Sequence, residues 1–161
     1  RDPSVSAPLV PPRASVVCRD MGLVEGVLED DTLPERLKEI TGEGVAVIFD
    51  MVGPDWNQLL KGLRIEGTLV MIGVLGGTKT ELDLRGMMQR RQTLTAMTMR
   101  SQPLEKRIAI ANVFNDRLAP LFANGRLRPL PLQTFPFSDA PAAHAHMIED
   151  ALSGKRVSVV D

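Results

Sequence analysis

Glycines follow two apolar runs of the chain, at points where a ligand can approach a protein backbone closely. The runs are Val45–Phe49 and Thr68–Ile72, and their β-branched composition predicts buried strands of a parallel sheet, covered on both faces. Ligands of such sheets bind beyond the carboxyl ends of the strands. The glycines at these ends are Gly53 after the first run and Gly73, Gly76 and Gly77 after the second. Glycine also makes tight turns, so the spacing alone leaves both uses open.

The residues between the two runs predict a helix that crosses from one strand to the next. Its apolar stripe, at spacings of three, four and seven from the first member, consists of Trp56, Leu59, Leu60 and Leu63. Strand, helix and strand form a βαβ unit, whose crossover is almost always right-handed. Such a unit brings the glycines that follow both strands to the same edge of the sheet.

Other residue types that do chemistry give weaker patterns. Cys18 is expected on a helix as a small core residue, because no helix N-terminus or neighbouring histidine is visible to lower its pKa. His144 and His146 lie two residues apart on a predicted helix and therefore point about 200° away from each other, whereas metal-binding histidine pairs favour a spacing of four. We therefore predict no metal site.

Composition narrows the classes of function. The chain has 161 residues, 43% of them hydrophobic, which suits one domain with a core. Its net charge of −1 gives no attraction to nucleic acid or to an anionic membrane. No apolar stretch is long enough to span a bilayer and no secretory signal is visible, so we expect a cytoplasmic protein.

Apolar spacing and turn residues predict the remaining elements. They are a short strand Gly26–Glu29, a helix Leu33–Thr41 capped by Asp31 or Thr32, a short helix with the stripe Leu84, Met87 and Met88, a strand Gln92–Met99, a long helix from Leu104 to Phe122, a helix from a Ser138 cap to about Leu152, and a terminal strand Val157–Val160. Arg90 and Arg91 are expected to form the solvated end of the short helix. Residues 1–14 carry four prolines and predict an extended arm.

An ordered series of motifs runs from about Cys18 to the C-terminus and resembles a known family. The motifs are Phe49-Asp50-Met51-Val52-Gly53, the pattern from Leu63 to Gly73, Leu75-Gly76-Gly77, Glu81-Leu82-Asp83-Leu84, Arg90 to Thr95, Met97 to Ser101, Gly125 to Pro129, and Gly154-Lys155. Together they are similar to the quinone oxidoreductase branch of the zinc-independent medium-chain dehydrogenase/reductases. Members of that family are about twice as long as this chain.

The resemblance implies an α/β fold that corresponds to the C-terminal part of a Rossmann-like doubly wound parallel sheet. A C-terminal strand–helix–strand tail would follow the sheet. We expect residues 1–14 to be the flexible arm, residues 15–125 a partial nucleotide-binding domain, and residues 126–161 a segment of the family's catalytic domain. The chain would thus be a truncated member of the family.

The resemblance also implies a function, namely hydride transfer from NADPH to a quinone or an activated alkene. The cofactor supplies this chemistry, so no catalytic side chain is assigned. The cofactor-binding residues that the resemblance implies are Val52, Gly53, Gly73, Val74, Leu75, Gly76, Gly77, Arg100, Ser101 and Lys155. The glycines would allow close approach of ribose and nicotinamide, while Arg100 and Lys155 would meet phosphate or polar groups.

Two departures from the family put cofactor binding in question. No predicted strand is followed by a glycine-rich G-x-G-x-x-G turn, which seats a pyrophosphate on a helix N-terminus. The chain has no tyrosine, and Leu28 stands where the family commonly has one that helps to hold a phosphate. We therefore expect weak or absent NADPH binding and no quinone turnover by this chain alone. The alternative is a non-catalytic binding or dimerisation module, with a homodimer formed through a sheet edge or an exchanged C-terminal tail.

Overall fold

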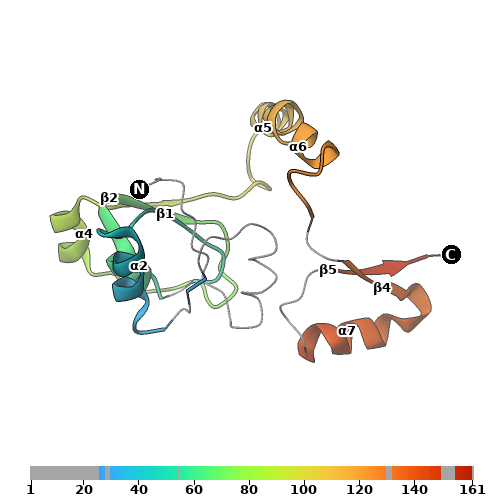
Figure 1. Ribbon diagram of the computed structural model, residues 1–161, viewed down its shortest axis with the longest axis horizontal. Helices are drawn as coiled ribbons and strands as arrows, with labels where there is room; N and C mark the ends of the chain where they lie inside the picture. The colour runs from blue at the N-terminus through green and yellow to red at the C-terminus, as the bar shows by residue number, and fades with distance from the viewer. Residues whose placement is uncertain (1–25, 28–29, 54, 130–131, 150–154, 161) are drawn as a thin grey trace. The chain divides into compact units, whose positions relative to one another are not determined.

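The computed structural model describes residues 26–27, 30–53, 55–129, 132–149 and 155–160 (Figure 1). One compact unit spans residues 27–103, and the described residues from 104 onward belong to a second unit. The expected N-terminal arm, the helix around Cys18 and the position of Leu28 lie outside the described residues. The predicted α/β class with parallel strands is confirmed, whereas the proposed domain division at residue 125 stays a prediction.

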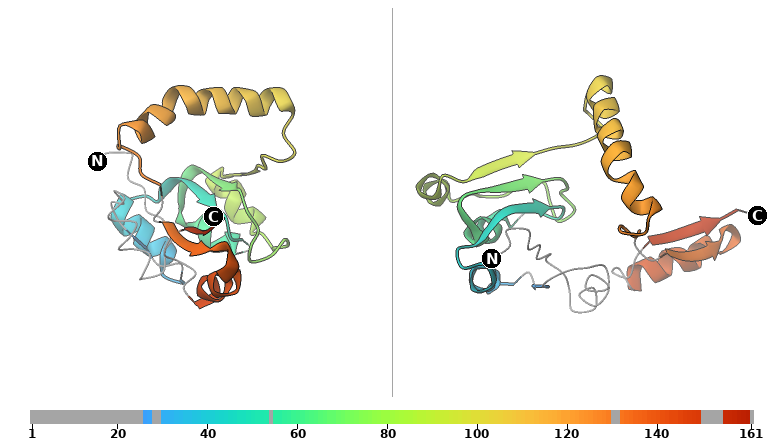
Figure 2. Two further views of the ribbon diagram at one scale, coloured as in Figure 1. Left: turned by 90° about the vertical axis from the view of Figure 1, so that its right-hand side faces the viewer. Right: turned by 45° about the horizontal axis from the view of Figure 1, so that its top comes forward.

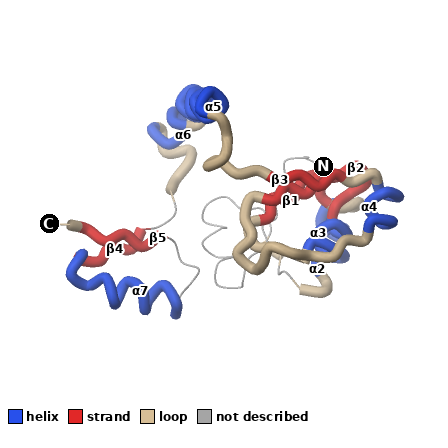
Figure 3. The backbone as a smooth tube through the Cα atoms, turned by 180° about the vertical axis from the view of Figure 1, so that it is seen from behind, coloured by secondary structure: helices blue, strands red, loops and turns tan. Residues whose placement is uncertain are grey.

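The first unit is a three-stranded parallel sheet with helices in the crossovers (Figure 2). Its elements are α2 (Leu33–Thr41), β1 (Val45–Asp50), α3 (Trp56–Gly62), β2 (Leu63–Met71), α4 (Leu84–Arg90) and β3 (Thr93–Ala96), with the strand order β1-β2-β3. The helices α2 and α3 lie side by side against one face of the sheet (Figure 3). Their buried side chains form the core with the strands, and the core residues are Val27, Leu33, Leu37, Ile48, Leu59, Leu60, Leu63 and Leu69.

The start of α2 is organised by a residue that the sequence analysis did not select. Thr32, one of the two predicted candidates, is the N-cap residue, but its side chain makes no capping hydrogen bond. Instead, Asp30 Oδ1 accepts hydrogen bonds from the Thr32 amide at 2.9 Å and from the Thr32 hydroxyl at 2.6 Å. These two donors hold the pKa of the Asp30 carboxyl below its usual value.

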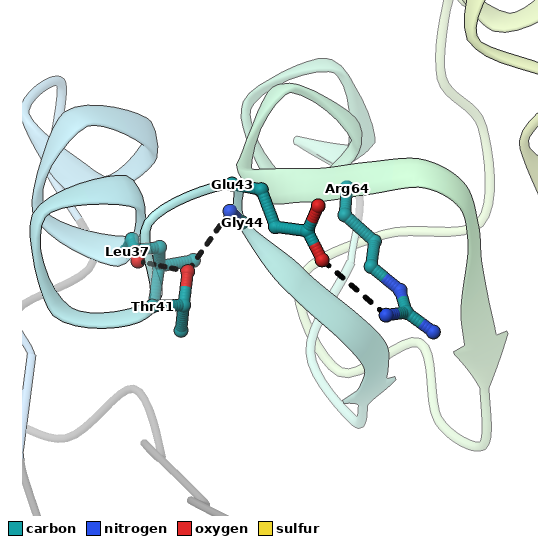
Figure 4. Close-up of polar contacts among 5 residues, drawn as sticks. All are labelled: Leu37, Thr41, Glu43, Gly44 and Arg64. Atoms are coloured by element: carbon teal, nitrogen blue, oxygen red, sulfur yellow. Dashed lines mark hydrogen bonds and ion pairs between the residues drawn. The ribbon is translucent and has the colours of Figure 1, made fainter. Parts of the chain in front are cut away.

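The turn between α2 and β1 is tightly constrained (Figure 4). The Thr41 hydroxyl donates to the Leu37 carbonyl at 2.7 Å and accepts from the Gly44 amide at 2.9 Å. Gly44 has φ of +103°, and a Cβ atom placed there would lie 2.6 Å from the Gly62 carbonyl oxygen. Only glycine suits both the conformation and the space, so this residue fixes how the chain enters β1.

The two faces of the sheet differ in burial. Ile48 of β1 pairs with Leu69 of β2, and both are buried beneath the helices. On the opposite face Val47 and Phe49 are exposed, Phe49 by 69%. The expectation that this strand is covered on both faces is therefore wrong for β1 in this structure, because α2 and α3 pack on one side.

The bounds of two strands differ from those predicted. Leu63 is not part of the helix before it: it begins β2 and is fully buried there, opposite Val45. An irregularity in the pairing lets β2 start five residues before Thr68, with Glu66 at a φ of +62°. The strand β3 ends at Ala96 instead of Met99, because its pairing with β2 ends where β2 ends, at Met71.

The second unit begins with two helices where one was predicted. They are α5 (Leu104–Arg117) and α6 (Ala119–Ala123), with the break at Leu118. Pro120 lies in the first turn of α6, and a proline inside a helix removes a backbone donor and clashes with the carbonyl four residues earlier. A ring contact between Phe114 and Phe122, with centroids 6.2 Å apart, keeps the two helices together.

The rest of the second unit is a small βαβ unit. Parallel strands β4 (Leu132–Pro136) and β5 (Lys155–Val159) pair with each other, and η1 (Phe137–Asp139) and α7 (Ala140–Glu149) connect them. Ser138 lies in the 3-10 turn and not at the helix N-cap, so α7 begins one residue later than a Ser138 cap would place it. None of the helices in the described ranges is long and apolar enough to cross a membrane.

Candidate functional site

A groove lies at the carboxyl ends of β2 and β3 in the first unit. It has a volume of about 480 Å³. The residues that line it come from the ends of both strands and from the loop after β3, and they are Met71, Ile72, Gly73, Val74, Ala96, Met97, Thr98, Ser101 and Gln102. Most are apolar, and the three polar side chains, of Thr98, Ser101 and Gln102, come from the loop after β3. A mainly apolar lining with a few polar groups is usual for a small-molecule site.

The turn after β1 is held by the buried carboxylate of Asp50, which is 7% exposed. Asp50 Oδ1 accepts from the Val52 amide at 2.9 Å, and Oδ2 accepts from the Gly53 amide at 2.9 Å and from the Trp56 indole nitrogen at 2.8 Å. Gly53 has φ of +55°, which closes the turn tightly. A carboxylate with three donors is well satisfied, so its burial is stable.

The loop after β2 lies against this turn. The Gly76 amide donates to the Val52 carbonyl at 2.7 Å, and the Gly77 amide donates to the Val74 carbonyl at 3.1 Å. Gly77 has φ of +150°. Leu75, at the tip, is 88% exposed. The edge of the sheet thus carries two joined loops beside the groove.

Gly73 is needed for a reason that the sequence did not show, namely a close contact between two backbone segments. Its φ is not positive, whereas those of Gly53 and Gly77 are. A Cβ atom on Gly73 would lie 2.4 Å from the Met51 carbonyl oxygen. The glycine is required because β2 passes directly against the backbone that leaves β1.

The structure brings most of the predicted cofactor-binding residues to this edge. Gly73, Val74 and Ser101 line the groove. Val52, Gly53, Leu75, Gly76 and Gly77 form the joined loops beside it. Arg100 is exposed in the turn after β3. Lys155 begins β5 in the second unit, and its assignment to the site stays a prediction.

Sequence reasoning missed four residues that build this edge, namely Asp50, Trp56, Thr98 and Gln102. Asp50 was visible as a lone carboxylate directly after an apolar run, which is a signal of a buried acceptor at a strand end. Trp56 was assigned only to the apolar stripe of α3, although a buried indole nitrogen usually needs a partner. Thr98 and Gln102 carried no distinguishing pattern.

A smaller hollow of about 180 Å³ lies between α3 and α4. Two of the polar side chains that line it, those of Arg90 and Gln92, form hydrogen bonds to the backbone. Arg90 does not face solvent as expected: its guanidinium donates to the Lys61 carbonyl at 3.0 Å and also to the Leu63 carbonyl, at the end of α3. The Gln92 amide donates to the Leu60 carbonyl at 2.7 Å. These groups satisfy the last carbonyls of a helix, which otherwise lack partners.

The sequence profile described as zinc-binding dehydrogenase matches residues 24–157, which is most of the chain. The chain belongs to this family. The expected membership in the dehydrogenase/reductase family is therefore confirmed. No curated protein matches the sequence significantly.

Solved structures of the same fold cover nearly the whole chain. A candidate alcohol dehydrogenase from Sinorhizobium meliloti 1021 has 27% identity and a TM-score of 0.76, with 98% of this chain and 42% of that chain covered. The ER cyclopropanase CurF of the curacin A biosynthetic pathway has 25% identity and a TM-score of 0.72, with 96% and 46% covered. A quinone oxidoreductase from Pseudomonas syringae pv. Tomato shares the fold at 20% identity and a TM-score of 0.70, with 95% and 47% covered. The chain thus spans less than half the length of these structures.

Of the two histidines of α7, His146 contacts neighbouring side chains in the second unit. A nitrogen of the Arg156 guanidinium lies 3.2 Å from His146 Nδ1, and the His146 ring meets Phe135 edge-on, with centroids 5.8 Å apart. His144 is exposed. Within the described ranges, no three histidine, cysteine, aspartate or glutamate residues lie close enough together to hold a metal ion.

Proposed function

We propose that this chain forms the nicotinamide side of an NADPH-dependent oxidoreductase that reduces quinones or activated alkenes. The observation that carries the proposal is the groove at the carboxyl ends of β2 and β3, lined by Gly73, Val74 and Ser101. Parallel α/β sheets bind their ligands at this position. Membership in a dehydrogenase family supports a nicotinamide cofactor.

The groove fits the nicotinamide end of such a cofactor in size and lining. About 480 Å³ lies within the usual range for small-molecule sites. Apolar side chains such as Ile72 and Val74 would contact the ring faces, and Thr98, Ser101 and Gln102 offer hydroxyl and amide groups to its carboxamide. Arg100 is exposed near this end and would meet a phosphate or other anionic group.

NADPH would supply a hydride to the acceptor, and a proton from solvent would complete a two-electron reduction. The residues of this chain would bind and orient the ring and exclude water from one of its faces.

Titration of the chain with NADPH tests this proposal. We expect saturable quenching of the fluorescence of Trp56, the single tryptophan, with a dissociation constant on the order of 1 mM, because no glycine-rich pyrophosphate turn is present in this sequence. NADH, titrated in parallel, measures the preference for the 2′-phosphate. The variant Thr98→Phe, which fills the groove, should abolish saturation.

Met88→Phe is the matched control, because Met88 is 78% exposed on α4 and does not line the groove. It should titrate like the unsubstituted chain. Quenching that does not saturate, or that is equal in the Thr98→Phe variant, contradicts a cofactor site in this groove.

A second candidate function is self-association, and exposed apolar side chains favour it. In the second unit Phe137, Val157 and Val159 are 64%, 40% and 45% exposed, and α5 has no buried residue. Burial of one such side chain is worth about 1.5 to 3 kcal/mol, so a second copy that covers several of them gains substantial stability. We propose a homodimer, formed through a sheet edge or an exchanged C-terminal tail.

Light scattering across a dilution series tests the homodimer. We expect the mass of a dimer at high concentration and a lower mass for the variant Val159→Lys. Ser158→Lys is the matched control. Neighbouring residues of a strand point to opposite faces of the sheet, so this variant places the same charge on the other face and should leave the dimer intact. A monomer at every concentration rules the homodimer out.

A further inference from the structure

The buried carboxylate of Asp50 is the point where three segments beside the groove meet. It accepts from the turn residues Val52 and Gly53 and from Trp56 at the start of α3. The main-chain carbonyl of Asp50 also accepts from the Ile72 amide at 2.8 Å. One residue therefore fixes the end of β1, the start of α3 and the exit of β2.

Val52 extends this constraint to the next loop. Its amide donates to Asp50, and its carbonyl accepts from Gly76 at 2.7 Å. The Gly77 carbonyl oxygen lies 3.6 Å from the position that a Cβ atom on Gly53 would occupy. The loop Leu75–Gly77 thus lies directly against the turn that Asp50 holds. The link from the Asp50 side chain to this loop runs through Val52.

We propose that Asp50 is a positioning residue, which sets the location of the Leu75–Gly77 loop through Val52 and thereby shapes the edge of the cofactor groove. Its effect on cofactor binding depends on the proposed function above. The chemistry requires a carboxylate, because its two oxygens only accept. An asparagine side chain would turn an NH2 group toward the Val52 amide in one orientation, or toward the Gly53 amide and the Trp56 indole in the other, and all three groups are donors.

Amide hydrogen exchange of the variant Asp50→Asn, followed by NMR, tests the hold on the loop. We expect exchange at the Gly76 amide to become faster by about tenfold or more. The variant loses the charged acceptor that holds Val52, and bonds to charged acceptors are among the stronger ones. The Val52 carbonyl, which accepts from Gly76, is then held less firmly. The Met97 amide, bonded to the Met71 carbonyl at 3.0 Å, serves as the internal reference and should change much less. Equal acceleration at both amides would mean a general loss of stability and would overturn the proposal.

Asp83→Asn is the matched control variant. Asp83 Oδ1 also accepts from a backbone amide, that of Gly86, at 3.0 Å, but at the start of α4. The same isosteric change at Asp83 should leave Gly76 exchange as it is in the unsubstituted chain. Accelerated exchange at Gly76 in the Asp83→Asn variant would show that any loop carboxylate has this effect and would count against Asp50.

NADPH titration of the same variants then links the loop to the groove. We expect Asp50→Asn to raise the dissociation constant by about tenfold at equal folded fraction, and Asp83→Asn to leave it unchanged. Unchanged affinity with a loosened loop would overturn the cofactor part of the proposal. If the unsubstituted chain binds no NADPH while the exchange pattern holds, the proposed function fails and the hold of Asp50 on the loop stands.

Discussion

Replacing Gly44 with alanine is expected to lower the free energy of unfolding of the first unit by about 3 kcal/mol or more. The φ of +103° lies in a region that residues with a side chain rarely adopt, which costs about 1 to 3 kcal/mol. The new Cβ atom would also lie 2.6 Å from the Gly62 carbonyl oxygen and 2.8 Å from the Leu63 carbonyl carbon. These atoms belong to the backbone and cannot rotate away, so the entry to β1 must shift.

Urea unfolding followed by Trp56 fluorescence measures this loss, because Trp56 lies in the same unit. Gly53→Ala is the matched control. Its φ is +55°, but the nearest atoms to its Cβ position are 3.6 Å away, which is ordinary contact. It should therefore show only the conformational cost, about 1 to 2 kcal/mol. A loss at Gly44 no larger than the loss at Gly53 would contradict the argument from close contact.

Elements with a strong local pattern were predictable from the sequence. The helix Leu33–Thr41 matches its predicted bounds because a proline, an apolar stripe and a following glycine all mark the same ends. The strand β1 was found from its apolar run alone. The break at Leu118 was missed although Pro120 marks it, because the apolar spacing on both sides was read as one continuous helix.

The parts that local pattern could not give depend on contacts between distant residues. Arg90 was assigned to solvent because basic residues suit the end of their own helix, yet it binds carbonyls of α3 some thirty positions earlier in the chain. The open face of β1 likewise follows from which helices pack on which side. An apolar run shows that a strand can be buried, but not how many of its faces a neighbour covers.

In the candidate site, too, the local sequence pattern predicted some features, whereas others depend on contacts between distant residues. The glycines at the two strand ends were found by their position after apolar runs, and the structure brings them to one edge. The sequence did not show why each of these positions needs a glycine. Gly53 and Gly77 serve positive φ, while Gly73 serves close passage of two backbones. At an ordinary φ, only close passage of two backbones prevents the replacement of a glycine by alanine, and this is the case at Gly73.

Substitution of Gly73 is therefore expected to damage the fold and the groove together. A Cβ atom at this position would lie 2.4 Å from the Met51 carbonyl oxygen and 3.1 Å from its carbonyl carbon. Relief requires β1 and β2 to separate at their carboxyl ends, which would strain the bond from the Ile72 amide to the Asp50 carbonyl. We expect a loss of about 2 to 3 kcal/mol in the free energy of unfolding and weaker NADPH binding.

A comparison of Gly73→Ala with Gly73→Val distinguishes this reason from a need for ligand space. If the backbone contact dominates, alanine already introduces the clashing atom, so both variants should lose similar stability in urea unfolding. If the glycine instead served only to leave room for a cofactor, alanine would be nearly neutral in stability, and valine would reduce affinity alone. NADPH affinities, measured where each variant is at least nine-tenths folded, complete the test. A stable Gly73→Ala variant would contradict the contact with Met51 and would restore ligand clearance as the reason for this glycine.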